Sequence, residues 1–99
     1  MDVYLPKKNQ IAPQVLRRLG YALYINKEGE QSFVRRLQGT NFPRFHLYIN
    51  EEDDTNLRCA LHLDQKAPSY LGSHAHGGDY DSATVKDEVA RLVRESTSS

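Results

Sequence analysis

Residues 72–81 have the sequence GSHAHGGDYD, in which two histidines are separated by one residue and lie between glycines. Alternate side chains of an extended backbone point the same way, so the rings of His74 and His76 would project to one side, as metal chelation requires. An imidazole also suits general acid–base catalysis, because its unperturbed pKa lies near 6.5. The same composition is typical of a polar turn before a helix, so the role of this stretch depends on the elements around it.

Two further histidines lie in the segment RFHLYINEEDDTNLRCALHLD, which predicts two strands joined by a solvated acidic turn. In each strand, over 44–50 and 57–64, apolar and polar residues alternate, so one face packs on the core and the other faces outward. His46 belongs to the polar face of the first strand, and His62 and Asp64 belong to the polar face of the second.

The register between these two strands decides how close the two histidines come. Both apolar faces are buried together only if odd-numbered residues pair with odd-numbered ones. A turn centred on Asp54 meets this condition and sets His46 directly opposite His62, with Cβ atoms roughly 4.5–5.5 Å apart. A turn centred on Asp53 sets the two histidines diagonally instead. In both registers the two rings share one face of the sheet.

The four histidines therefore form a candidate metal site. Three imidazole ligands and a position open to water would make a zinc-type catalytic centre, in which the metal lowers the pKa of the bound water towards ~7. Asp64, Asp79 or Asp81 could add a carboxylate. The chain has no CxxC or HExxH pattern, so the spacing matches no strong zinc signature. The candidate metal ligands are His46, His62, His74 and His76, the candidate catalytic residues are His62, His76 and Asp64, and the candidate ions include zinc and manganese.

Two other interpretations use the same side chains. Without a metal, a histidine could act as a general base that is oriented by Asp64 or Asp79. Alternatively, His46 and His62 are ordinary polar residues of a sheet face, and the two loop histidines hydrogen-bond to the backbone. The residues expected to contact a ligand on this face or in the loop are Tyr48, Arg58, Lys66, Tyr70 and Tyr80.

The composition limits the cellular location and the partners. Cys59 is the only cysteine among 99 residues, which excludes an intrachain disulfide and favours the cytoplasm. No apolar run approaches the ~20 residues of a membrane span. Residues 1–50 carry eight Lys or Arg against three Asp or Glu, whereas residues 51–99 carry five against ten. This asymmetry can indicate a nucleic-acid or protein partner for the basic first half, but the favoured interpretation is that the two halves intermix in space and their fields cancel.

The first third of the chain predicts a short helix and a hairpin. Pro13 suits a first helical turn and Gly20 suits the residue past the helix end. Two β-prone runs, 21–26 and 31–37, flank a turn closed near Gly29. Tyr21, Leu23 and Ile25 alternate onto one face of the hairpin, which Phe33 and Leu37 continue on the second strand.

A longer helix is predicted from Ala83 to Arg94, capped by Ser82 or Asp81. Its inner face would consist of Val85, Val89, Leu92 and Val93, with Asp87 and Arg91 paired on the outside. The expected architecture is a single α+β domain over residues 1–95 with a frayed tail over 96–99. It contains a four-stranded, mainly antiparallel sheet made of two hairpins, with a short N-terminal and a longer C-terminal helix on the apolar face.

The stretch HLDQKAPSYLGSHAHGGDYD, residues 62–81, resembles a group of small uncharacterised bacterial proteins that share the pattern HLDQK-x-PSY-x-G-x-x-AH-x-G-x-YD. The pattern covers about a fifth of the chain, and this group brings no known activity with it.

The chain also resembles the metal-dependent phosphoesterase domain attached to bacterial end-joining DNA ligases. The matching features are SFVRR, then RFH with His46, then a hairpin, then QKAPS and a later histidine, His74 or His76. The chain departs from that family at Tyr48, where the family has an aspartate, and at Ala67, where it has a glycine. This resemblance implies metal-dependent phosphoester hydrolysis.

The sequence thus favours a small binding module that uses the polar histidine and tyrosine face with the loop over residues 64–81. The alternative is a metal-dependent, phosphoesterase-like hydrolase with a histidine cluster. Whether the protein is an enzyme depends on whether that loop folds back over the strand face that carries His46 and His62.

Overall fold

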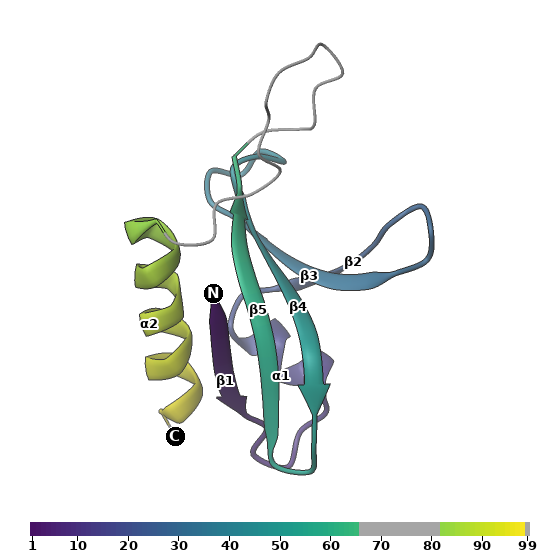
Figure 1. Ribbon diagram of the computed structural model, residues 1–99, viewed down its shortest axis with the longest axis vertical. Helices are drawn as coiled ribbons and strands as arrows, with labels where there is room; N and C mark the ends of the chain where they lie inside the picture. Colours follow the sequence, from purple (N-terminus) through teal and green to yellow (C-terminus); the bar gives the residue numbers. More distant parts are fainter. Residues whose placement is uncertain (66–81, 99) are drawn as a thin grey trace.

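The computed structural model describes residues 1–65 and 82–98, and its five strands form one antiparallel sheet in the order β1-β5-β4-β3-β2 (Figure 1). The α+β class and the two predicted hairpins are confirmed. Along the chain the elements are β1 (Asp2–Pro6), α1 (Ala12–Arg18), β2 (Ala22–Ile25), β3 (Gln31–Arg36), β4 (Arg44–Glu52), β5 (Asn56–Asp64) and α2 (Ala83–Thr97).

The predicted number of four strands is wrong, because β1 adds a fifth strand at the edge of the sheet. It pairs antiparallel with β5, with Val3 opposite Cys59 and Leu5 opposite Leu57. Edge strands of this kind are short and tolerate charge and proline, and β1 begins at an aspartate and ends at a proline. Only two of its apolar residues are buried, and an alternation this short is not enough to predict a strand from the sequence.

The core lies between one face of the sheet and the two helices. Every second residue of β5 from Leu57 to Leu63 is buried there, and Phe45 and Leu47 of β4 are buried opposite Leu63 and Leu61. Figure 1 shows α1 behind the sheet and α2 alongside β1. The buried apolar residues of this core are Val3, Leu5, Ala12, Val15, Leu16, Leu19, Tyr21, Phe33, Phe45, Leu47, Leu57, Cys59, Leu61, Leu63, Val85 and Leu92.

The hairpin of β2 and β3 extends past the helices, and its turn projects away from them (Figure 1). Tyr21 and Phe33 are buried as their alternation predicts, but Leu23 and Ile25 are 50% and 54% exposed. Leu37 is also exposed. The alternation correctly places these side chains on one face, but no described helix reaches far enough to cover it.

Helix α2 differs from its predicted pattern in two ways. Ser82 caps it, with its side chain accepting a hydrogen bond from the Val85 amide at 3.2 Å, but the helix continues to Thr97 rather than ending at Arg94. Val93 is exposed rather than buried.

Arg91 pairs with the buried Glu88 at 2.7 Å instead of with Asp87. Glu88 lies on the inner side because it is three residues after Val85 and four before Leu92. Neither helix in the described part of the chain is long and apolar enough to cross a membrane.

Candidate functional site

The sheet face opposite the helices carries a block of four polar side chains from β4 and β5. His46 pairs directly with His62, and Arg44 pairs directly with Asp64. The predicted opposition of the two histidines is confirmed. The register from Arg44 to Ile49 is that of a turn centred on Asp54, and a β-bulge between Ile49 and Glu51 shifts the pairing nearer the turn by one residue. The two imidazole rings are nearly perpendicular, with centroids 5.1 Å apart.

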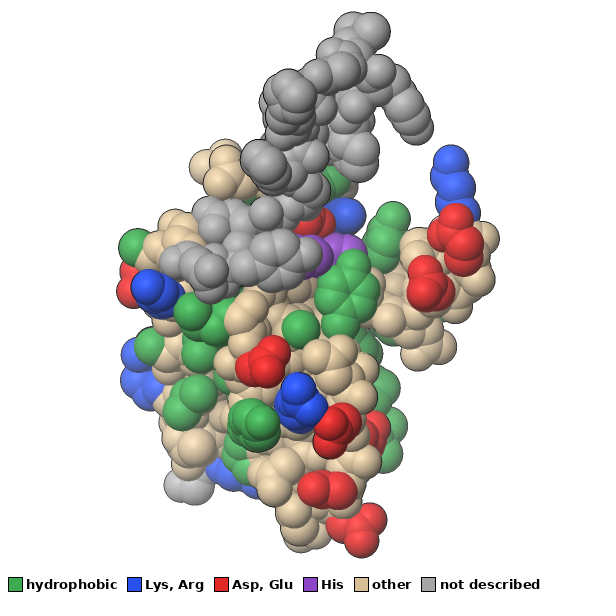
Figure 2. All heavy atoms as spheres, viewed as in Figure 1, with side chains coloured by type: hydrophobic (Ala, Val, Ile, Leu, Met, Phe, Trp, Pro, Cys, Tyr) green, Lys and Arg blue, Asp and Glu red, His purple; other side chains and the backbone are tan. Residues whose placement is uncertain are grey.

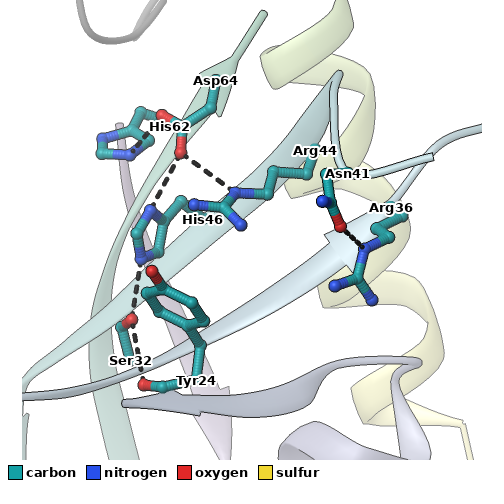
Figure 3. Close-up of polar contacts among 8 residues, drawn as sticks. All are labelled: Tyr24, Ser32, Arg36, Asn41, Arg44, His46, His62 and Asp64. Carbon is teal, nitrogen blue, oxygen red and sulfur yellow. Dashed lines mark hydrogen bonds and ion pairs between the residues drawn. The ribbon is translucent and has the colours of Figure 1, made fainter. Parts of the chain in front are cut away.

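Asp64 joins the two imidazoles (Figure 3). Its Oδ2 lies 3.0 Å from His46 Nδ1, and its Oδ1 lies 3.0 Å from His62 Nε2. Burial of Asp64 by itself raises the pKa of the carboxyl, but the hydrogen bonds and charges of the two imidazoles outweigh it. The pKa of Asp64 is therefore held well below its ordinary value. The carboxylate is ionised at neutral pH, as a metal ligand must be.

Ser32 on β3 completes a hydrogen-bonded chain through His46. Its Oγ lies 2.7 Å from His46 Nε2 and 3.5 Å from the backbone carbonyl oxygen of Tyr24. The Ser32 hydroxyl can donate to Nε2 of a ring whose proton is on Nδ1, or accept from Nε2–H of a ring whose proton is there. In both cases the Nδ1 of His46 is directed at the Asp64 carboxylate.

His46 can use Nδ1 in two ways. With the ring proton on Nδ1, the imidazole donates to the Asp64 carboxylate at 3.0 Å and Ser32 donates to Nε2, so the contacts are satisfied by the neutral ring. If Nδ1 were to bind a metal ion, the ring proton would lie on Nε2 and would be donated to Ser32.

Aromatic rings and an arginine surround the cluster. The Tyr48 ring stacks on His46 with centroids 4.5 Å apart, and the Tyr24 ring meets His46 edge-on at 6.0 Å. Arg44 donates from Nε to Asp64 Oδ2 at 3.4 Å, and its guanidinium stacks on the rings of Tyr24 and Phe42. These contacts restrict the orientation of the imidazole and of the arginine.

The cluster is largely buried but lies next to the surface. His46 and Asp64 are each 7% exposed, whereas Tyr48 is 38% exposed. In the space-filling view, histidine side chains reach the surface beside a hydrophobic side chain and side chains of both charges (Figure 2).

The geometry of the three residues is compatible with a metal ion. One ligand atom each from His46, His62 and Asp64 lies within 4.8 Å of the other two. Metal–ligand bonds of about 2.0–2.1 Å at tetrahedral angles separate neighbouring ligand atoms by about 3.3 Å, and each imidazole lies 3.0 Å from a different oxygen of Asp64. Two imidazoles and one carboxylate form a ligand set used by zinc and by non-haem iron, with further positions open.

The structure brings only part of the predicted site together. His46, His62, Asp64 and Tyr48 are adjacent. Arg58 lies on β5 nearer the acidic turn, four residues before His62, and forms an ion pair with Glu51. The remaining predicted residues, Lys66, Tyr70, His74, His76, Asp79, Tyr80 and Asp81, lie outside the described residues.

Ser32 and Arg44 are not among the residues that the sequence predicts for the site. Alternation along β3 does predict that Ser32 points to the polar face, because its neighbour Phe33 points to the core on the other face. Its distance from His46, however, depends on the pairing of β3 with β4, which belong to different predicted hairpins. The irregular segment between them gives no sequence signal for that register.

No known family model, no curated protein and no solved structure matches the chain. The two resemblances noted in the sequence therefore stay predictions. Any functional conclusion has to come from the side chains of the site.

Proposed function

We propose that this protein binds one divalent transition-metal ion through His46, His62 and Asp64, and that it is a metal-dependent hydrolase. The main support is the contact of Asp64 with both imidazoles at 3.0 Å, which brings two imidazole nitrogens and a carboxylate together on one face of the sheet. A bound ion of the zinc type would act as a Lewis acid and lower the pKa of a coordinated water towards ~7. A phosphoester is the expected substrate class, and the cytoplasm is the expected location.

The protein's own residues have separate roles in this proposal. His46 and His62 would bind the ion as neutral imidazoles, and Asp64 would supply the negative charge. With an ion on Nδ1, Ser32 would orient His46 by accepting its Nε2 proton, which is the usual role of the hydrogen-bond partner of a ligating histidine. Arg44 would attract an anionic group to the same face.

Metal titration by isothermal calorimetry tests the binding step. Wild type should bind Zn²⁺ or Mn²⁺ at a ratio of one, and Asp64→Asn and His62→Ala should abolish this binding. Ser32→Ala should weaken the affinity by about 10–100-fold, because it removes the partner that orients a ligand. Asp54→Asn is the matched control, since Asp54 is an exposed aspartate in the turn before β5, and it should bind metal like wild type.

Turnover of a generic phosphoester tests the hydrolase step. Metal-loaded wild type should hydrolyse bis(p-nitrophenyl) phosphate, and His62→Ala should not, while its circular dichroism spectrum stays that of wild type. The same assay on His76→Ala asks whether the loop supplies a further ligand. Wild type that binds no metal and shows no turnover would contradict the proposal.

A second candidate, a binding module on the same face, is favoured by the partial exposure of Tyr24 and Tyr48 beside Arg44. Exposed aromatic rings next to a cation can stack on nucleic-acid bases. This candidate predicts binding to single-stranded RNA or DNA that weakens steeply with salt and is reduced by Tyr48→Ala. Absence of binding at low salt would eliminate it.

A further inference from the structure

A cavity of about 510 Å³ lies on the helix side of the sheet, away from the histidine cluster. It is lined by parts of both helices, by β3 and by the turn after β1. Its size falls in the range of about 300–1,000 Å³ that is typical of small-molecule sites. The cationic side chains that line it are Lys8, Arg18, Arg35 and Arg91, and the one anionic side chain in its lining is Glu95.

Two of these cations are partly buried and share a single carboxylate. Arg91 donates from Nε and Nη2 to Glu88 at 2.7 Å and 2.9 Å, and from Nη2 to the Leu19 carbonyl at 2.8 Å. Arg35 Nε lies 3.6 Å from the same carboxylate. Glu88 also accepts a hydrogen bond from Tyr21 at 2.6 Å. The two guanidinium groups are thus balanced by one negative charge.

The rim of the cavity adds to this excess of positive charge. Arg18 is exposed and makes no ion pair with any described residue. Lys8 uses Nζ to donate to the Ser98 carbonyl at 2.8 Å, which leaves two of its N–H donors. Only Glu95 opposes them. The four cations and the two carboxylates, Glu88 and Glu95, therefore leave two positive charges among the described residues.

The backbone at the rim is also unusual. Lys8 and Asn9 both have positive φ, 53° and 64°, a conformation that costs energy in residues other than glycine. The neighbouring Gly20 has a φ of +97°, and a Cβ placed there would lie 3.3 Å from Arg35 Cδ. Lys8 thus reaches the cavity from a backbone conformation that most side chains disfavour, and the absence of a side chain at Gly20 leaves room for Arg35.

We propose that this cavity binds a small molecule through its phosphate group. A phosphate dianion would neutralise the two uncompensated positive charges, and arginine forks bind phosphate oxygens with favourable geometry. The cavity is on the opposite side of the sheet from His62, so this site is independent of the proposed metal site. The phosphate of a free ion and that of a phosphomonoester share the same chemistry, and the experiment below separates them.

Nuclear magnetic resonance titration of the full chain with inorganic phosphate, adenosine 5′-monophosphate and adenosine tests the proposal. Phosphate and the monophosphate should perturb amides next to Arg18 and Arg35, and adenosine alone should not. Tighter binding of the monophosphate would identify a phosphomonoester as the ligand, and equal affinities would identify free phosphate. Absence of perturbation by either phosphate compound overturns the proposal.

Variants that change the charge at the rim should change the affinity for phosphate in opposite directions, depending on the sign of the charge removed. The double variant Lys8→Gln, Arg18→Gln should weaken phosphate binding by about tenfold, since it removes two charge-assisted contacts. Glu95→Gln should strengthen binding by about two- to fivefold, as expected for removal of one exposed repulsive charge. All three positions are exposed or at the surface, so the fold should persist, as circular dichroism can verify.

Arg17→Gln is the matched control, because Arg17 is an exposed arginine next to Arg18 that does not line the cavity. It should leave the affinity for phosphate unchanged. A loss in this variant as large as in the double variant would show general attraction to a basic surface and would overturn the proposal. His62→Ala should also bind phosphate like wild type, which separates this result from any failure of the metal site.

Discussion

Asp64 is the residue on which the histidine cluster depends. Its two oxygens contact His46 and His62, and Arg44 also pairs with it. Removing one partner of a largely buried ion pair leaves the others without compensation and typically costs about 3–5 kcal/mol. The same carboxylate therefore serves the stability of the sheet face and the proposed binding of metal.

The lowered pKa of Asp64 makes stability depend on pH in the acid range. Because the folded-state pKa lies below the unfolded value near 3.9, the unfolded chain binds a proton first as the pH falls. The contribution of Asp64 is therefore complete above about pH 4 and is lost below it, by up to about 1.4 kcal/mol per pH unit. Urea denaturation at pH 5 and pH 3 should show a smaller loss for Asp64→Asn than for wild type.

The control for this prediction is Asp54→Asn, which removes a carboxylate of the same type from an exposed turn. It should keep the pH dependence of wild type. If the free energies of unfolding of Asp64→Asn and wild type fall equally between pH 5 and pH 3, Asp64 does not carry this dependence.

At the scale of elements, one buried polar contact joins α2 to the segment before β2. Tyr21 donates its hydroxyl to Glu88 at 2.6 Å, and Arg91 holds the same carboxylate. Burial, together with the nearby Glu88 carboxylate, raises the pKa of Tyr21 above its ordinary value. The hydroxyl stays protonated and continues to donate at any pH at which the protein is used.

Tyr21→Phe should lower the free energy of unfolding by about 1–3 kcal/mol, because the buried carboxylate loses a donor. Tyr4→Phe is the matched control, since Tyr4 is 61% exposed, and it should change stability by no more than about 0.5 kcal/mol. Chemical denaturation of both variants measures the difference. Equal stabilities would mean that this contact does not fasten α2 to the sheet.

At the scale of the whole molecule, the two proposed sites lie on opposite faces of one sheet. Both helices cover one face, and the histidine cluster occupies the other. The basic and the acidic half of the chain lie side by side in this arrangement, because β1 from the first half pairs with β5 from the second. The charges that determine the two proposed sites are that of Asp64 on one face and those of the cavity arginines on the other.

A metal that binds only the folded protein should stabilise the entire molecule. At a free concentration of 100 times Kd, the gain is about 2.7 kcal/mol, which should raise Tm by about 10 °C or more in a domain of this size. Addition of a chelator should reverse the shift, and Asp64→Asn should show none. Differential scanning calorimetry measures the effect, and an unchanged Tm in wild type would contradict metal binding at this site.

Local patterns in the sequence were sufficient for most of the elements and for the core of the site. Alternation in β4 and β5 implied which residues face the core, and the need to bury both apolar faces implied the pairing of His46 with His62. These inferences succeed because strand periodicity and burial act over a few residues. The capping of α2 by Ser82 is local in the same way.

Only the tertiary structure decided the contacts between elements that are far apart in the sequence or joined by an irregular segment. The addition of β1 beside β5, the contact of Ser32 with His46 and the cavity between the helices all depend on long-range packing. The exposure of Leu23 has the same origin, since no described helix extends over that hairpin. Sequence periodicity specifies which face a residue takes, whereas the partner that meets that face is selected by the packing of the complete chain.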